Sequence, residues 1–330
     1  MPTSAPDKTW IRTGVGLGIS LVFLLITLSR VDLELLGKAW QGIVPATLVS
    51  AIVLATIEVA VRAERWRVLL KPIAASAFLT AYGLLAIGHL GNAALPARLG
   101  DLGRAVIAGS RLHASRTAVL GTIAVERVAD AGLLVAAGAA GIVAGYGAAL
   151  QGTLVLLILS GAAAGIAVVG GALLLQRSSL GRTRFGARVQ EYGRLAASGA
   201  SALKDPWQAA RVGALSLASF AVAILILQAC AWSLSLTLTL GQSAVVIAAV
   251  TLSTAIPAGP ASIGTYEFVG MTVMSTMGFT PEQSLMAVGL LHAIATLTPA
   301  CLGAASLWLM GVSLDFHPDR SLFRTRSSLP

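Results

Sequence analysis

Long hydrophobic stretches dominate the chain, and its polar residues gather in the segments between them. Six apolar runs approach or exceed the roughly 20 residues that a helix needs to cross a membrane. They cover residues 14–29, 43–61, 117–140, 153–175, 212–238 and 284–311. The pattern therefore predicts an all-α polytopic membrane protein with about six full spans.

Two further apolar stretches, 73–110 and 243–280, are each interrupted by polar and helix-breaking residues. Such a backbone at membrane depth is tolerated only where it is buried in protein or lines a wet cavity. We therefore expect two re-entrant hairpins of broken helices, which enter the membrane and return. The residues expected to shape the two breaks are Asn92, Pro96, Gly100, Pro257 and Gly264. The alternative for the first stretch is that residues 73–95 cross the membrane completely.

Basic residues mark the cytoplasmic loops of membrane proteins. Lys8 and Arg12 precede the first run, a cluster from Arg62 to Lys71 follows the second, and residues 176–211 are strongly basic. This distribution predicts that both termini are cytoplasmic and that the hairpins enter from opposite sides, as an inverted repeat. The alternative crossing at 73–95 would place the most basic loop outside. No small-x-small cleavage pattern follows residue 29, so we expect an uncleaved first span.

One membrane domain, residues 1–330, is expected, with repeat halves at approximately 43–140 and 212–311. Hydrophobic residues form 56% of the chain and charged residues 11%, with a mean hydropathy of +0.83. A soluble protein averages roughly 25% charged residues. The net charge of +9 lies in loops beside apolar runs, which favours membrane orientation over nucleic-acid binding. We expect a multi-pass protein of the cell (inner) membrane.

Three charged residues, Glu126, Arg127 and Asp130, interrupt an otherwise apolar run. Each costs roughly 2.5–3.5 kcal/mol at the centre of a membrane helix, so they must face the protein interior. Spacings of three and four residues place them on one side of the helix. One interpretation is a buried Arg127–Asp130 pair that holds helices together. The other is a headgroup or ion site shared with four further residues. These are Arg98, Asp101, Arg104 and Glu267.

A motif series runs through both halves: Asn92 to Arg104, then Glu126–Arg127–x–x–Asp130, then Pro257 to Glu267. This series resembles the transmembrane region of lysylphosphatidylglycerol synthases, a flippase-like family that also occurs as stand-alone membrane proteins. The resemblance covers essentially the whole chain. It implies a protein that moves lipids between leaflets, or helps to move them. The aminoacyltransferase domain of the synthases is not expected, because the chain ends soon after its last apolar run.

Two residues depart from the pattern of that family. Asp101 stands where the family usually has Glu, which keeps the negative charge. His292 stands where the family commonly has Arg, and a buried imidazole is often neutral. His292 is therefore either a substrate-site residue or a satisfied polar residue in the packing.

No Walker-type loop, HExxH motif, nucleophile elbow or metal-ligand cluster is present in the sequence. We therefore expect no catalysis, no cofactor and no metal. The leading hypothesis is a flippase or transporter for an anionic, phosphate-bearing lipid or lipid-linked intermediate. In it, Arg98, Arg104 and Arg127 bind the headgroup, because guanidinium groups bind phosphate in a bidentate fashion.

Two alternatives remain. One is a non-catalytic accessory protein that binds a lipid- or glycan-biosynthesis enzyme. The other is an intramembrane transferase that uses Glu126 or Asp101 as a base. The expected partners are membrane lipids with anionic headgroups, and no nucleic acid.

Overall fold

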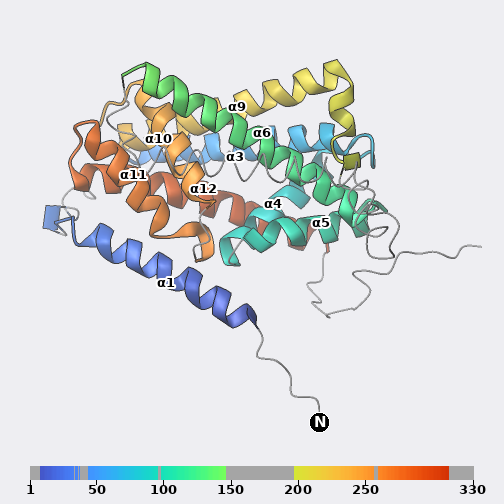
Figure 1. Ribbon diagram of the computed structural model, residues 1–330, viewed down its shortest axis with the longest axis horizontal. Coiled ribbons are helices and arrows are strands. Elements are labelled where there is room, and N and C mark those ends of the chain that lie inside the picture. Colours follow the sequence, from blue (N-terminus) through green and yellow to red (C-terminus); the bar gives the residue numbers. More distant parts are fainter. Residues whose placement is uncertain are drawn as a thin grey trace, which may run out of the picture.

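The computed structural model describes residues 8–32, 34–35, 37, 44–95, 98–145, 197–255 and 259–311, and in this part of the chain all regular structure is helical (Figure 1). The α-helices are α1 (Lys8–Leu28), α3 (Pro45–Leu70), α4 (Phe78–Ala94), α5 (Leu99–Arg111), α6 (Arg116–Val143), α9 (Pro206–Ser233), α10 (Leu240–Ser253), α11 (Thr265–Thr276) and α12 (Pro281–Leu309). Two short 3-10 helices, η4 (Ser201–Lys204) and η5 (Pro260–Ser262), precede α9 and α11. The predicted all-α class is confirmed.

Three helices in the described ranges, α3, α9 and α12, are long and apolar enough to cross a membrane. They contain most of the apolar runs 43–61, 212–238 and 284–311. Helix α6 is also 28 residues long, but it carries the three charged residues of the run 117–140. The run 153–175 lies outside the described residues. The structure thus supports a helical membrane protein, while six full spans stay a prediction.

Local signals fix where the long helices begin. Helices α3, α9 and α12 each have proline in the first turn, where the missing N–H is not needed. In α10 the Thr239 hydroxyl accepts from the N–H of Gln242, and the Gln242 side chain accepts from the N–H of Thr239. Thr280 and Gln283 form the same capping box before α12.

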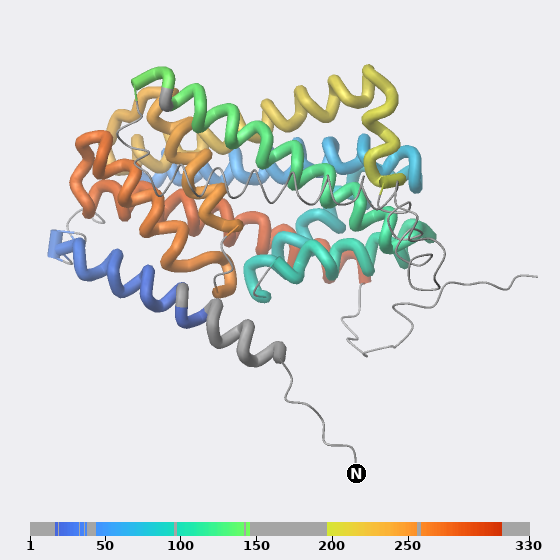
Figure 2. Tube along the Cα trace, viewed as in Figure 1, coloured from blue at the N-terminus to red at the C-terminus, as the bar shows by residue number. Residues whose placement is uncertain are grey.

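Both interrupted stretches form pairs of helices. Helices α4 and α5 are joined through residues 95–98, and α10 and α11 through residues 254–264. Figure 2 shows the two hairpins running in from opposite ends of the molecule, with their breaks adjacent near its middle. Pro96 and Pro257, the prolines expected in the breaks, lie outside the described residues. A helix does end at each break, but α4 lies within residues 73–95, so the re-entrant first hairpin stays a prediction beside the alternative of a complete crossing.

Glycines allow the chain to pack closely at both breaks. A Cβ atom on Gly100 would lie 2.2 Å from the carbonyl oxygen of Gly88, so α5 starts directly against the backbone of α4. Gly264 has φ +90°, a conformation that favours glycine, and a Cβ there would lie 2.3 Å from the Ser20 carbonyl oxygen in α1. The first hairpin thus packs on itself, whereas the second packs on α1.

The apolar core has two large parts, one beside each hairpin. The first surrounds α4 and α5 and uses α3 and α6, with Trp66 and Leu70 among its buried members. The second surrounds α10 and α11 and uses α9 and α12, with Ile226, Met274 and Leu291 among its buried members. Both hairpins therefore pack against the protein core, which a broken backbone at membrane depth requires.

The basic cluster after the second apolar run is not a loop. Arg62, Arg65 and Arg67 belong to α3, which continues to Leu70. Arg65 is buried with a relative exposure of 2%. Only Lys71 follows the helix, so this segment gives less support for a cytoplasmic loop than the sequence suggested.

Candidate functional site

The two breaks are in direct contact through Arg98. This residue precedes α5 in the left-handed region, with φ 55°, and its Nη2 donates a hydrogen bond to the Thr254 hydroxyl at the end of α10. Ala261 and Ser262 in the second break also have positive φ, at 55° and 60°. Non-glycine residues in this region cost of order 1–3 kcal/mol each, and such strain concentrates at functional sites.

A cavity of about 580 Å³ lies at this contact and is lined by both breaks. We call it the central cavity. Its charged and ionisable lining comes from α3, α4, α6, α11, α12 and the first break. These residues are Glu58, Arg62, His89, Arg98, Arg127, Asp130, Tyr266 and His292. Apolar residues such as Leu134, Phe220 and Ile247 complete the wall. The volume is within the range of small-molecule sites, and the mixed lining suits an amphiphile.

A buried ion-pair group, which we call the inner cluster, consists of Arg65, Arg104, Glu126 and Asp130. Arg104 lies 2.6 Å from Glu126, and Arg65 lies 3.6 Å from the other oxygen of Glu126. Arg65 also forms two hydrogen bonds with the carboxylate of Asp130. The Arg104 guanidinium stacks 4.4 Å from the Trp66 ring. Three helices, α3, α5 and α6, are joined here.

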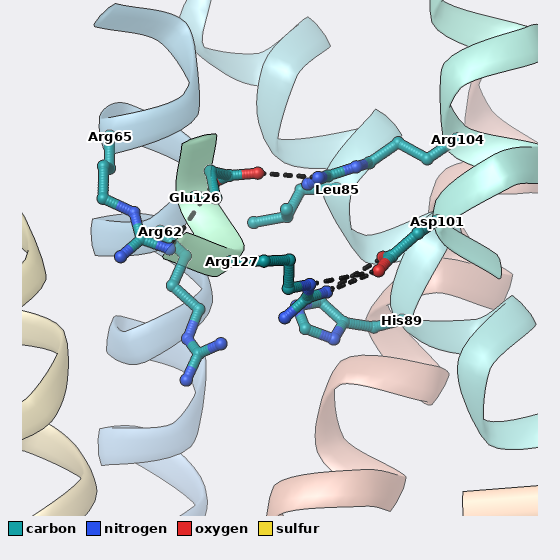
Figure 3. A pocket seen from close by; sticks show the side chains of 8 residues that line it. All are labelled: Arg62, Arg65, Leu85, His89, Asp101, Arg104, Glu126 and Arg127. Carbon is teal, nitrogen blue, oxygen red and sulfur yellow. Dashed lines mark hydrogen bonds and ion pairs between the residues drawn. The ribbon is translucent and has the colours of Figure 1, made fainter. Parts of the chain in front are cut away.

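Figure 3 shows this region from close by, with the Arg104–Glu126 pair beside the Arg127–Asp101 pair. The gap between them has a volume of only about 10 Å³, the size of roughly one water molecule. A phosphate group does not fit. Arg104, which we expected to bind a headgroup, is instead buried and occupied by Glu126 and Trp66. In this structure the inner cluster joins three helices, and headgroup binding by Arg104 stays a prediction.

Arg127 pairs with Asp101 and not with Asp130. Its Nη2 lies 2.7 Å from Asp101 Oδ2 and 3.0 Å from Oδ1, across the interface between α6 and α5. Asn92 of α4 donates to the same carboxylate at 3.0 Å and accepts from the Asp101 N–H at 3.2 Å. Of the two interpretations of these charges, the Arg127–Asp130 pair is not formed, because Asp130 binds Arg65 and Arg127 binds Asp101.

Arg98 differs from the other arginines of this region because, in the described ranges, no carboxylate lies within ion-pair distance of it. The arginines around the central cavity and inner cluster are Arg62, Arg65, Arg98, Arg104 and Arg127. Their acidic partners are Glu58, Asp101, Glu126 and Asp130. Five cations therefore face four anions, and the unmatched charge is at Arg98, on the wall of the central cavity.

Glu267 and His292 form a separate pair at the second break. His292 Nδ1 lies 2.5 Å from Glu267 Oε1, and its Nε2 lies 2.9 Å from the Ala261 carbonyl oxygen. The other Glu267 oxygen accepts from the Gly264 N–H at 2.7 Å. His292 lines the central cavity, whereas Glu267 contacts His292 and is not part of the described lining. His292 is thus a satisfied packing residue that also faces the cavity.

Sequence reasoning missed the role of Arg65 and the exposure of Arg62 to the cavity. Glu58 and Arg62, four residues apart in α3, form a local pair, with 2.6 Å between Arg62 Nη2 and Glu58 Oε1. The signal for Arg65 was helical periodicity: residues 58, 62 and 65 fall on one helix face, and Trp66 continues the apolar pattern.

The fold and site define a helical membrane protein with two broken hairpins that meet at a charged cavity. Residues 14–303 match the family described as the lysylphosphatidylglycerol synthase TM region, and the chain belongs to this family. A relative in Haloferax volcanii named glycosyltransferase AglD is 28% identical over 92% of this chain. That alignment covers 54% of AglD, so the chain spans about half the length of this relative. No solved structure matches the chain.

Proposed function

We propose that the protein moves an anionic lipid, or a lipid-linked intermediate that carries phosphate, between membrane leaflets. The observation that carries this proposal is Arg98, a cation without a carboxylate partner in the described residues, at the contact between two helix breaks. A guanidinium group in a partly apolar cavity is stabilised by an anion, and a phosphate oxygen forms charge-assisted hydrogen bonds with it.

The charge count favours a headgroup with one negative charge, such as a phosphodiester. Arg62 and Arg127 also face the central cavity, but each is already paired with a carboxylate. A monoanion compensates the single excess charge without breaking either pair. The apolar wall next to these arginines offers a place for the first part of a lipid chain.

Movement between leaflets requires that the cavity open in turn to each side. The two hairpins enter from opposite ends and meet at their breaks, which supports an inverted-repeat arrangement with alternating access (Figure 2). In this proposal the protein is a transporter of the inner membrane with both termini in the cytoplasm, and it carries out no chemical step.

The test uses purified full-length protein in lipid vesicles. Short-chain fluorescent phosphatidylglycerol is the anionic probe, fluorescent phosphatidylcholine is the zwitterionic comparison, and albumin extracts the probe from the outer leaflet. We expect the protein to accelerate transfer of phosphatidylglycerol. When the probe concentration limits the rate, Arg98→Gln should reduce transfer about tenfold or more. This reduction corresponds to the loss of one hydrogen bond to a charged group.

Arg67→Gln is the matched control, because Arg67 pairs with Glu64 at the end of α3 and does not line the central cavity. It should transfer the probe like the unaltered protein. Equal rates for Arg98→Gln and the unaltered protein, or no acceleration over protein-free vesicles, would refute the proposal.

The name of the AglD relative favours a second candidate, a membrane domain that works with a glycan-transferring partner. Such a protein has no transfer activity alone in vesicles and gains one when the partner is added. Recovery of a covalently changed lipid from the vesicles would instead indicate an intramembrane transferase.

A further inference from the structure

We propose that His292 and Glu267 form a proton-binding site that couples proton release to movement of the second hairpin break. The inference rests on the proposed transport function, since it names what drives the same central cavity. The atoms concerned are His292 Nδ1 and Nε2, the Glu267 carboxylate and the Ala261 carbonyl oxygen. We call this arrangement the His292 latch.

Hydrogen-bond chemistry fixes the number of protons in the latch. The Ala261 carbonyl oxygen only accepts, so the contact at 2.9 Å requires a proton on His292 Nε2. The contact between Nδ1 and Glu267 at 2.5 Å requires a second proton, on either the imidazole or the carboxyl group. Both contacts together therefore need two exchangeable protons.

Removal of one proton breaks one of these contacts. A neutral imidazole carries a single N–H, and an ionised carboxylate carries none. If that N–H faces Ala261, the Nδ1 lone pair faces the Glu267 carboxylate; if it faces Glu267, the Nε2 lone pair faces the Ala261 carbonyl. Either way two acceptors face each other without a hydrogen. The closed latch is thus the protonated form, and one proton leaves when it opens.

The latch holds Ala261 in the same break that contacts Arg98 through Thr254. Ala261 belongs to η5 within the second break, and the same Glu267 side chain holds the Gly264 N–H. Thr254, at the start of that break, accepts the Arg98 hydrogen bond. When the latch opens, Ala261 in the break is no longer bonded to His292 of α12. We expect the Arg98–Thr254 contact at the other end of the break, with which a headgroup competes, to weaken as a result.

Other ionisable groups also face the central cavity and are included in the test. They are Glu58 and Arg62 of α3, His89 of α4, Arg98 before α5, Arg127 and Asp130 of α6, and Tyr266 of α11, whose ring stacks 4.2 Å from His292. Arg30, beyond α1, lies over Phe268 next to Glu267. Helices α9 and α10 contribute no charged residue to the described lining. Among these groups, His89 is the histidine that lines the cavity besides His292, so it needs its own control variant.

The first measurement does not depend on transport. The chain has four histidines, so nitrogen NMR of protein labelled at histidine, in lipid nanodiscs, resolves His292 by comparison with His292→Gln. We expect the His292 ring signals to change as the pH rises, because loss of one latch proton breaks one of the two hydrogen bonds of the ring. Glu267→Gln should abolish this change, because its amide N–H replaces the exchangeable proton. A His292 signal that is insensitive to pH, or unaffected by Glu267→Gln, would overturn the proposal.

The second measurement follows fluorescent phosphatidylglycerol transfer at equal pH on both sides of the vesicle. We expect the rate to fall about tenfold as the pH is lowered, because the latch then stays closed. Glu267→Gln and His292→Arg supply donors that persist at every pH, and both should give a slow rate that does not vary with pH. His113→Asn, at an exposed loop position with φ 50°, should keep the normal profile.

The outcomes separate the two proposals. A rate independent of pH in the unaltered protein, or a pH dependence that His89→Gln removes and Glu267→Gln does not, overturns the latch but leaves lipid transfer standing. Absence of transfer in every sample refutes the transport function, and the NMR result then still decides whether the proton site exists.

Discussion

Arg104 and Arg127 show how two neighbouring ion pairs of similar length differ in their surroundings. The side chains of Arg104 and Glu126 are 2% and 5% exposed, whereas those of Arg127 and Asp101 are 36% and 16% exposed. Water can replace a lost partner only for the second pair. The first pair should therefore matter for folding, and the second for the properties of the cavity.

We predict that Arg104→Met lowers the free energy of unfolding by about 3–5 kcal/mol, because it leaves Glu126 buried with only the longer contact to Arg65. Arg127→Met should cost clearly less, since both members of its pair reach water. Unfolding of the purified variants in mixed detergent micelles measures the difference. An equal loss in the two variants would contradict this distinction.

The partners of these charges were difficult to predict from sequence for a physical reason. Residues three or four apart on a helix are near each other, so Arg127–Asp130 was one of two interpretations of the sequence. In the structure the long side chains of Arg65, Arg104 and Arg127 instead bind acids on neighbouring helices. Which helices are neighbours is a property of the whole fold, and the sequence alone did not contain it.

At the scale of elements, the helix breaks were predictable because they depend on local chemistry. Glycine, proline and polar residues within apolar runs located both breaks to within a few residues. The contact between α1 and the second break was not predicted. It includes one hydrogen bond, in which Ser20 Oγ accepts from the Gly259 N–H at 2.8 Å, and the close approach of Gly264 to the Ser20 carbonyl oxygen. A serine in an apolar run carries no local signal for such a role.

Gly100 and Gly103 provide a matched pair for testing the first hairpin. A Cβ on Gly100 would lie 2.2 Å from the Gly88 carbonyl oxygen, whereas a Cβ on Gly103, one turn later in α5, meets nothing within 4 Å. We predict that Gly100→Ala destabilises the protein by about 1–3 kcal/mol or more through this clash. Gly103→Ala should be neutral, or stabilising by about 0.5–1 kcal/mol, because alanine favours the helix. Thermal unfolding in detergent measures both.

At the scale of the molecule, the orientation in the membrane remains a prediction from loop charge. Residues 146–196 lie outside the described structure, and they contain most of the basic loop. We predict that this loop and both termini are cytoplasmic. In a background without Cys230 and Cys301, Arg188→Cys should resist a membrane-impermeant thiol reagent in intact cells and react after the membrane is opened. Labelling in intact cells would reverse the topology and the proposed entry sides of the hairpins.

The two hairpins differ in stiffness, and the origin is the way each break is held. In the first, the backbone of α5 rests on the backbone of α4 at Gly91 and Gly100, so the two helices cannot slide past one another without collision. In the second, the break rests on the α1 backbone at Gly264 and is also held by hydrogen bonds of the Ser20, Glu267 and His292 side chains. A force at the contact between the breaks should therefore shift the second break relative to α1 and α12, whereas the two helices of the first hairpin stay together.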